Sequence, residues 1–170
     1  MKILDCTLRD GGYYNDWDFD SRTVDCYLAA MNRLPVDMIE VGYRSLPSKS
    51  YMGRFGYSPR FELERVRERS QKQVAVMFNE KDIRVSDLPT VLDPVADLVD
   101  MVRMAVAPTN MARAIELGRA IKERGIAVAF NVMYMSKWGE MSEFLELLPQ
   151  LDGWVDCINM VDSFGGVTPD

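Results

Sequence analysis

The sequence predicts an α/β protein with a parallel sheet, and two observations lead to that class. Apolar runs with the length of buried strands alternate along the chain with amphipathic, helix-like segments. The starts of these runs recur about every 30 residues, which is the spacing of repeated βα units. About six such units fit into the 170 residues.

Each expected strand is an apolar run bounded by polar or turn-forming residues. The first run, KILDCTL, stops just before Arg9 and Asp10, and the last run, VDCINMVDSFGG, ends in two glycines. The expected strands cover residues 2–8, 36–44, 73–79, 100–106, 126–135 and 155–166.

The segments between the strands carry helix signals at their ends. Ser21 is a plausible N-cap, Pro59 suits a first helical position, and Gly125 suits the end of the most amphipathic helix. Prolines interrupt the helical segment of the third βα unit, so a broken helix is expected there. The expected helices cover residues 21–34, 58–72, 86–99, 110–125 and 140–151.

Two folds are compatible with this order of elements. An open doubly wound sheet would be complete at this length, whereas a (β/α)8 TIM barrel needs ~250 residues and would be truncated before its seventh strand. Thr168 and Pro169 have the pattern of a helix start, which favours the barrel. We therefore expect residues 1–170 to be the N-terminal portion of a single TIM-barrel domain in a longer protein.

Composition limits the possible functions. A net charge of −6 and a pI near 4.8 argue against a nucleic-acid partner. No apolar run approaches the ~20 residues of a membrane span, and the N-terminus lacks a signal-peptide pattern. The scattered Cys6, Cys26 and Cys157 fit reduced thiols and a cytoplasmic protein, with Cys6 and Cys157 as small core residues. The chain has no histidine, which excludes Ser-His and Cys-His nucleophiles within it.

Polar or charged residues stand at the end of every expected strand. In both folds these ends form the functional edge, and burying such groups is costly unless they are paired or bind a ligand. We therefore expect a polar cavity mouth. The candidate residues are Arg9, Asp10, Glu40, Tyr43, Arg44, Asn79, Arg103, Asn131, Asp162 and Ser163.

Structural explanations remain open for part of this set. Arg103 could form an ion pair with Glu40 or Asp162 inside the barrel, and Asn131 could satisfy loop backbone groups. The aromatic residues of the first loop could simply pack over the mouth: Tyr13, Tyr14 and Trp17.

The stretch that follows the first strand combines residues suited to catalysis. Asp10 is a hard oxygen ligand for Mg²⁺, Mn²⁺ or Zn²⁺, and Arg9 carries a permanent charge on a fork that matches a carboxylate or enolate. Gly11 and Gly12 would let the backbone turn sharply and approach a ligand. A cation beside a metal-bound carboxylate would stabilise negative charge that develops on an oxygen.

Three motifs, TLRDG (7–11), IEVGYR (39–44) and VDSFGG (161–166), resemble those of the aldolase/HMG-CoA-lyase-like family of metal-dependent TIM barrels. That family, with its pyruvate carboxyltransferase-like domain, includes 4-hydroxy-2-oxovalerate aldolases, HMG-CoA lyase, and the isopropylmalate and homocitrate synthases. The motifs occur in the family's order and are spread over the whole chain.

The resemblance implies a role for each matching residue. Asp10 would bind the divalent metal, Arg9 would stabilise the enolate and hold the substrate, and Glu40 would position Arg9 or a metal-bound water. Gly11 and Gly12 would form the loop beside the metal. The expected substrate-binding residues are Arg9, Gly11, Gly12, Arg103, Asn131, Asp162 and Ser163.

The sequence departs from the family at two points. The family's remaining metal ligands, a histidine pair on strand 7, would lie beyond this chain. Tyr13 stands where aldolase members carry a histidine base, so we name Tyr13 as a catalytic candidate, although a tyrosine pKa of ~10 makes a poor base near neutrality.

The resemblance implies a metal-dependent carbon–carbon lyase that acts on a 4-hydroxy-2-oxo acid or a similar small 2-oxo acid. The alternatives are a Claisen-type synthase that joins an acyl-CoA to a 2-oxo acid, and a non-catalytic barrel that only binds ligands. We expect the 170-residue chain to be inactive alone. Its two open sheet edges predict edge-paired self-association or a homo-oligomer.

Overall fold

The computed structural model describes residues 1–48 and 50–168 of the chain. Pro169, where a helix start was expected, lies outside them. The strands are β1 Leu4–Asp5, β2 Met38–Tyr43, β3 Gln73–Asn79, β4 Met101–Val106, β5 Ala127–Val132 and β6 Cys157–Met160. The α-helices are α1 Thr7–Gly11, α2 Ser21–Arg33, α3 Arg54–Tyr57, α4 Arg60–Arg69, α5 Leu88–Val91, α6 Met111–Lys122 and α7 Ser142–Leu147. The 3₁₀ segments are η1 Gly12–Tyr14, η2 Glu80–Asp82, η3 Val85–Asp87, η4 Asp93–Leu98, η5 Pro108–Asn110, η6 Met135–Glu140 and η7 Leu148–Leu151.

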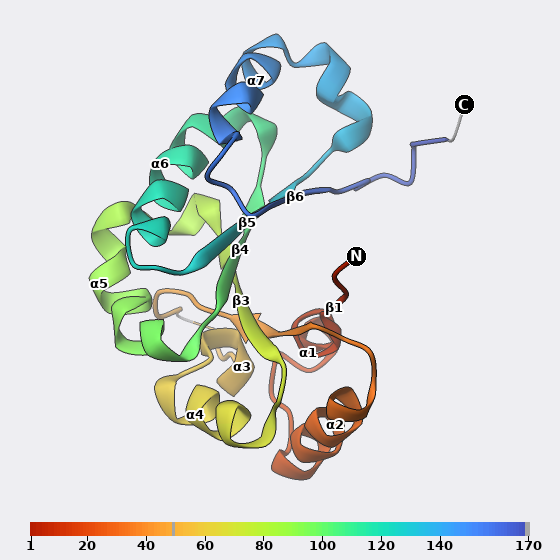
Figure 1. The fold of residues 1–170 in the computed structure, drawn as a ribbon, viewed down its shortest axis with the longest axis vertical. Helices are drawn as coiled ribbons and strands as arrows, with labels where there is room; N and C mark the ends of the chain where they lie inside the picture. Colours follow the sequence, from red (N-terminus) through yellow and green to blue (C-terminus); the bar gives the residue numbers. More distant parts are fainter. Residues whose placement is uncertain (49, 169–170) are drawn as a thin grey trace.

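All six strands belong to one sheet in the order β1-β2-β3-β4-β5-β6, and every neighbouring pair is parallel. The sheet curls, and helices α2, α4, α5, α6 and α7 lie around its outer, convex side (Figure 1). A doubly wound sheet would reverse its strand order and cover both faces. The structure is therefore a six-stranded half-barrel, and the doubly wound alternative is wrong.

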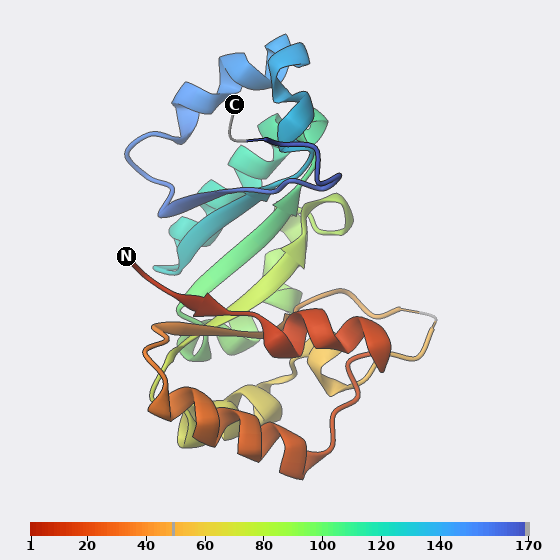
Figure 2. The same cartoon turned by 90° about the vertical axis from the view of Figure 1, so that its right-hand side faces the viewer.

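The two faces of the half-barrel differ in burial, as β4 shows. Val102, Met104 and Val106 on the convex face are fully buried, whereas Met101 and Arg103 on the concave face are only partly covered. Figure 2 looks onto this concave face, from which the N-terminus emerges. A face that holds polar residues and is open to solvent is available to bind a ligand.

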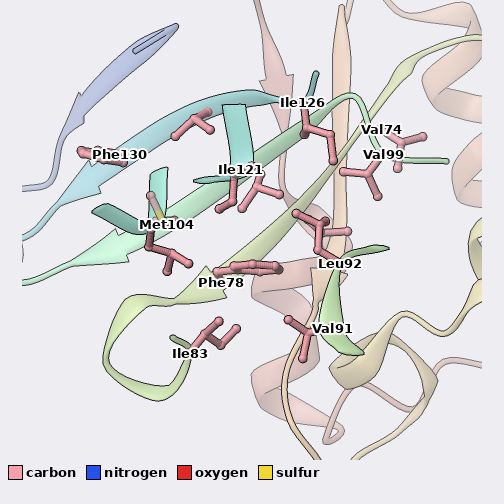
Figure 3. Close-up of a cluster of buried hydrophobic side chains, with 14 of the residues drawn as sticks. Val74, Phe78, Ile83, Val91, Leu92, Val99, Met104, Ile121, Ile126 and Phe130 are labelled. Atoms are coloured by element: carbon pink, nitrogen blue, oxygen red, sulfur yellow. The ribbon is translucent and has the colours of Figure 1, made fainter. Parts of the chain in front are cut away.

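The hydrophobic core lies between the convex face of the sheet and the helices. Phe78, Met104 and Phe130 project from neighbouring strands onto Ile121 of α6 and Leu92 beside α5 (Figure 3). Each of these five side chains is fully buried. Removing apolar surface from water stabilises the fold by roughly 25 cal/mol per Å². The apolar runs therefore favour a sheet whose convex face is covered by helices.

The first strand is shorter than the expected 2–8, because Asp5 starts a helix. Its carboxylate accepts hydrogen bonds from the Thr7 N–H at 3.0 Å, the Thr7 hydroxyl at 3.0 Å and the Tyr27 hydroxyl at 2.7 Å. Such a local acceptor competes with strand pairing. The TLRDG motif therefore forms the helix α1 instead of a strand end.

Other elements are also shorter than expected. The segment expected as a helix over 86–99 contains α5 and two 3₁₀ segments around Pro89 and Pro94, in agreement with the expected break. The last strand stops at Met160, and Cys157, expected in the core, is exposed on it. No helix within the described ranges is long and apolar enough to cross a membrane.

Candidate active site

A bulge in β2 sets the geometry of the site. The register between β2 and β3 shifts between Glu40 and Gly42, so that Glu40 pairs with Ala75 and Gly42 with Val76. One extra residue in a strand reverses the alternation of faces beyond it. As a result, Glu40 and Tyr43, three positions apart, both reach the concave side.

Glu40 links two arginines from different strands. Its Oε2 accepts hydrogen bonds from Arg9 Nε at 2.8 Å and from Arg103 Nη1 at 2.9 Å. The side chain of Glu40 is 0 % exposed, and those of Arg9 and Arg103 are 13 % and 11 % exposed. The structural ion pair considered for Arg103 is thus present, and it is part of the same cluster as Arg9.

The cluster continues across the last two strands through amides. Arg103 Nη2 donates to Asn131 Oδ1 at 3.1 Å, and Asn159 Nδ2 donates to the same oxygen at 2.8 Å. Asn131 therefore binds side chains and not loop backbone. Asn159 was missed in the sequence, although the alternation of Cys157, Asn159 and Val161 along one strand face would have placed it here.

The electrostatics of Arg9 depend on Glu40. Burial acts to lower the pKa of Arg9, but the charge of Glu40 and its hydrogen bond, followed by Asp10, outweigh burial and raise it above its ordinary value. Arg9 Nη1 also contacts a carboxylate oxygen of Asp10. Nη2 of Arg9 has no hydrogen-bond partner among the described residues, so it is the part of the guanidinium left for a ligand.

Asp10 is the metal-ligand candidate, and its second carboxylate oxygen accepts a hydrogen bond from the Cys6 thiol at 3.0 Å. The Asp10 side chain is 55 % exposed. Burial, and then the contact with Asp10, raise the pKa of Cys6 to about 11. Over the described part of the chain, no group of three or more metal-binding side chains comes together. Asp10 fits as one oxygen ligand, and any others would have to come from outside these residues.

Tyr13 reaches the site from η1 and pairs with Tyr43, their hydroxyl oxygens lying 2.6 Å apart. Burial, and then this hydrogen bond, raise the pKa of Tyr43 above its ordinary value. Tyr43 is 8 % exposed and Tyr13 is 61 % exposed. Tyr14, by contrast, is almost fully exposed and takes no part.

Trp17 packs beside this pair and ties the loop to α1. Its Nε1 donates to the carbonyl of Arg9 at 2.8 Å, and its ring makes edge contacts with Tyr13 and Tyr43. Asp16 and Trp17 have φ angles of 54° and 57°, a left-handed conformation that costs energy in non-glycine residues. This backbone conformation places the indole of Trp17 against Tyr13 and Tyr43.

The two glycines of the loop have a different role from the one expected. Gly11 and Gly12 are right-handed helical, with φ near −60°, and make no sharp turn. A Cβ on Gly12 would lie 1.9 Å from Cδ1 of Trp17. Gly12 is therefore needed to admit the indole, while Gly11 has more room, with the ring of Phe19 at 3.7 Å.

A cavity of about 450 Å³ opens at the carboxyl ends of the strands. Of the sequence candidates, Arg9, Tyr13, Tyr43, Asn79 and Asn131 line it. The other lining residues are Met77, Glu80, Lys81, Ala105, Ala107, Asn110, Met133, Tyr134 and Val161. Glu40 lies beneath this lining, so it positions Arg9 without facing a ligand. We call this space the Arg9 cavity.

Asp162 and Ser163 do not line the Arg9 cavity. Asp162 accepts hydrogen bonds from the backbone N–H groups of Gly166 and Val167, both at 3.1 Å, which lower its pKa. The Ser163 hydroxyl accepts from the Tyr134 N–H at 3.1 Å. In this structure both residues shape the turn after β6.

Arg103 lies deeper on the concave face, where it lines a second cavity of about 440 Å³.

Comparison with known proteins supports this picture of the fold. A scan against protein-family models and a search of curated proteins found no match. A solved structure described as the "N-terminal domain of a putative aldolase from Bacteroides vulgatus" matches 99 % of the chain with 57 % identity and a TM-score of 0.96. The chain has the fold of an aldolase-like half-barrel.

A second solved structure extends the comparison of folds. A truncated 3-deoxy-D-arabino-heptulosonate 7-phosphate synthase from Thermotoga maritima matches 100 % of the chain with 15 % identity and a TM-score of 0.52, which shows the fold alone. The chain spans 56 % and 55 % of the length of these two proteins. Neither likeness singles out the HMG-CoA lyase family, so that assignment stays a proposal.

Proposed function

We propose that the protein carrying this chain is a metal-dependent carbon–carbon lyase of the aldolase type, acting on a 4-hydroxy-2-oxo acid or a similar 2-oxo acid. One observation carries the proposal: Arg9 lines a cavity and is held by Glu40 and Asp10, while its Nη2 has no hydrogen-bond partner among the described residues. The 57 % identity to a protein described as an aldolase domain supports it.

The chemistry needs a fixed cation where negative charge develops. Cleavage of a 4-hydroxy-2-oxo acid leaves the electron pair of the broken bond on the pyruvate fragment, as an enolate. Arg9 would donate from Nη2 to the carboxylate or the enolate oxygen of that fragment. Because its other nitrogens are already bound, the guanidinium needs little reorganisation in the transition state.

Glu40 and Arg103 act as positioning residues in this proposal. Glu40 holds Arg9 Nε, and Arg103 helps to neutralise Glu40. A divalent metal with Asp10 as one ligand would supply Lewis-acid polarisation of the 2-oxo group when bound. Its remaining ligands would come from a part of the protein outside this chain.

Proton transfer is assigned to Tyr13, the cavity residue that replaces the histidine of similar aldolases. Its hydroxyl bonds to that of Tyr43, and burial raises the pKa of Tyr43 above its ordinary value, so ionising Tyr43 is unfavourable. Tyr43 would therefore stay neutral and orient the Tyr13 hydroxyl, and Tyr13 would be the group that exchanges a proton with the ligand.

Binding of oxalate, a planar mimic of the pyruvate enolate, tests the proposal. We expect oxalate to bind the full-length protein in the presence of Mn²⁺, as measured by calorimetry. Arg9→Met should weaken binding at least about tenfold, the loss of a charged hydrogen bond, and Asp10→Ala should remove the dependence on Mn²⁺. Arg22→Met, at an exposed position of α2, is the matched control. Unchanged oxalate affinity in both site variants would contradict the proposal.

A further inference from the structure

Another cavity, distinct from the one that Arg103 lines, lies beside the Arg9 cavity and has a different chemical character. It encloses about 410 Å³ and shares Tyr13, Tyr43 and Asn79 with the Arg9 cavity. The hydrogen-bonded Tyr13–Tyr43 pair thus belongs to the walls of both. Apolar residues make up much of the remaining wall: Trp17, Leu46, Pro47, Met52 and Ile83. We call this space the Arg44 cavity.

Arg44 is the cationic residue in this lining, and it is 9 % exposed. Its Nε donates to the Val91 carbonyl at 2.7 Å, and its Nη1 donates to the carbonyls of Tyr57 at 2.9 Å and Ser58 at 3.3 Å. These acceptors are neutral. Burial lowers the pKa of Arg44 from its ordinary value, the sign of a desolvated charge.

Three partly buried arginines of the fold have carboxylate partners, unlike Arg44 in the part of the chain that the structure describes. Arg9 and Arg103 share the carboxylate of Glu40, and Arg65 contacts Asp25 and Glu62. Arg44, within the described residues, has no carboxylate within salt-bridge distance. A buried charge without a counter-ion is costly, so this position favours a ligand that brings one.

The remaining polar groups of the cavity leave room for such a ligand. Asp82 also lines it, but this residue is exposed and forms no ion pair with Arg44. Nη2 of Arg44 has no hydrogen-bond partner among the described residues. This nitrogen is therefore the part of the guanidinium that can donate a charge-assisted hydrogen bond to a carboxylate.

We propose that the Arg44 cavity binds an organic carboxylate, with its charged group on Arg44 and its apolar body against Trp17 and Ile83. The apolar wall disfavours inorganic anions, which would lose their hydration without gaining contacts. This site is separate from the Arg9 cavity, and the proposal stands whether or not that cavity performs aldol chemistry.

Benzoate is the probe, because it joins one carboxylate to an apolar ring, and benzyl alcohol is its neutral counterpart. We expect benzoate to cause saturable shifts in the amide NMR signals of Ser45, Leu46 and Ile83, which line the Arg44 cavity and not the Arg9 cavity, in the full-length protein. Benzyl alcohol should bind at least about tenfold more weakly, since it lacks the charged hydrogen bond. This comparison uses the wild-type protein only, so it does not depend on a variant that folds.

Arg44→Gln should lose the preference for benzoate, while Arg22→Gln, at an exposed position of α2, should retain it. Equal binding of benzoate and benzyl alcohol would overturn the proposal, as would shifts confined to residues around Arg9 or no binding at all. Because oxalate reports on the Arg9 cavity, the two sites can fail independently.

Discussion

Arg103 and Glu40, 63 positions apart in the chain, meet on the concave face with Nη1 and Oε2 at 2.9 Å. The same carboxylate oxygen binds Arg9 at 2.8 Å, while Oε1 of Glu40 is buried and has no hydrogen-bond partner in the described part of the chain. The contact joins β4 to β2 and, through Arg9, to α1. Stability of the half-barrel and the orientation of the candidate catalytic arginine therefore depend on one side chain.

Glu40→Gln tests this dependence. The substitution keeps the shape of the side chain but leaves two buried guanidinium groups without their shared counter-ion. Removing one partner of a buried ion pair typically costs about 3–5 kcal/mol, and we expect a loss of that order in the free energy of unfolding, measured by urea denaturation.

The matched control is Asp97→Asn, at the exposed pair between Asp97 and Arg60, where both guanidinium–carboxylate distances are 2.8 Å. Solvent screens this pair, so its loss should change stability far less. Equal losses of stability in the two variants would show that the contacts of Glu40 with Arg9 and Arg103 stabilise the fold no more than an exposed ion pair does.

Gly12→Ala tests the fit between α1 and the indole. The added methyl group would lie 1.9 Å from Trp17 Cδ1, so the ring must move and its hydrogen bond to the Arg9 carbonyl must break. We expect a loss of about 1–3 kcal/mol on urea unfolding and a changed near-ultraviolet circular dichroism spectrum. Gly139→Ala, where nothing lies within 4 Å of the added carbon, should leave both unchanged. An intact tryptophan signal in Gly12→Ala would refute this packing.

The raised pKa of Tyr43 predicts how stability depends on alkaline pH. An unfolded tyrosine loses its proton near pH ~10, whereas the folded one keeps it to higher pH. The stabilisation is thus fully present below about pH 10 and is lost as the pH rises further, by up to about 1.4 kcal/mol per pH unit. Tyr43→Phe should have a shallower decline in the free energy of unfolding between about pH 10 and 11. Parallel curves for the two proteins would contradict the assignment.

The edge strand β6 predicts self-association of the chain. Within the described residues β6 pairs only with β5, and Ile158 and Met160 on it are 40 % and 64 % exposed. Exposed edges with apolar side chains favour pairing with another chain. Sedimentation should show concentration-dependent association that Met160→Lys reduces. A chain that stays monomeric at every concentration would rule this out.

Much of the fold follows from local sequence pattern. Alternating apolar runs and helix signals predicted the six parallel strands and their sequential neighbours, because each βα unit packs on the one before it. The predicted strands were too long where a side chain accepts hydrogen bonds that end the strand. Asp5, which starts a helix, is the clearest example: its hydrogen bond to Thr7 is local, but the one to Tyr27, 22 positions away, depends on tertiary structure.

The site was only partly predictable. Arg9, Asn79 and Asn131 were expected at one cavity because parallel strand ends share an edge, and they line one cavity in the structure. The bulge that turns Tyr43 inward has no simple sequence signal. The close approach of Trp17 to Gly12 and the hydrogen bond from the Gly166 N–H to Asp162 were not predicted, because apolar periodicity does not reveal such contacts.

Exchange of the methyl protons of pyruvate in D₂O, followed by proton NMR, tests the central claim most directly. Enolisation of pyruvate is a step of the proposed reaction that needs no knowledge of the aldehyde. We expect the full-length protein with Mg²⁺ to accelerate exchange, Arg9→Met to lower the rate by about 100-fold, and Arg22→Met to leave it unchanged. Exchange no faster than in buffer with Mg²⁺, or an undiminished rate in Arg9→Met, would contradict it.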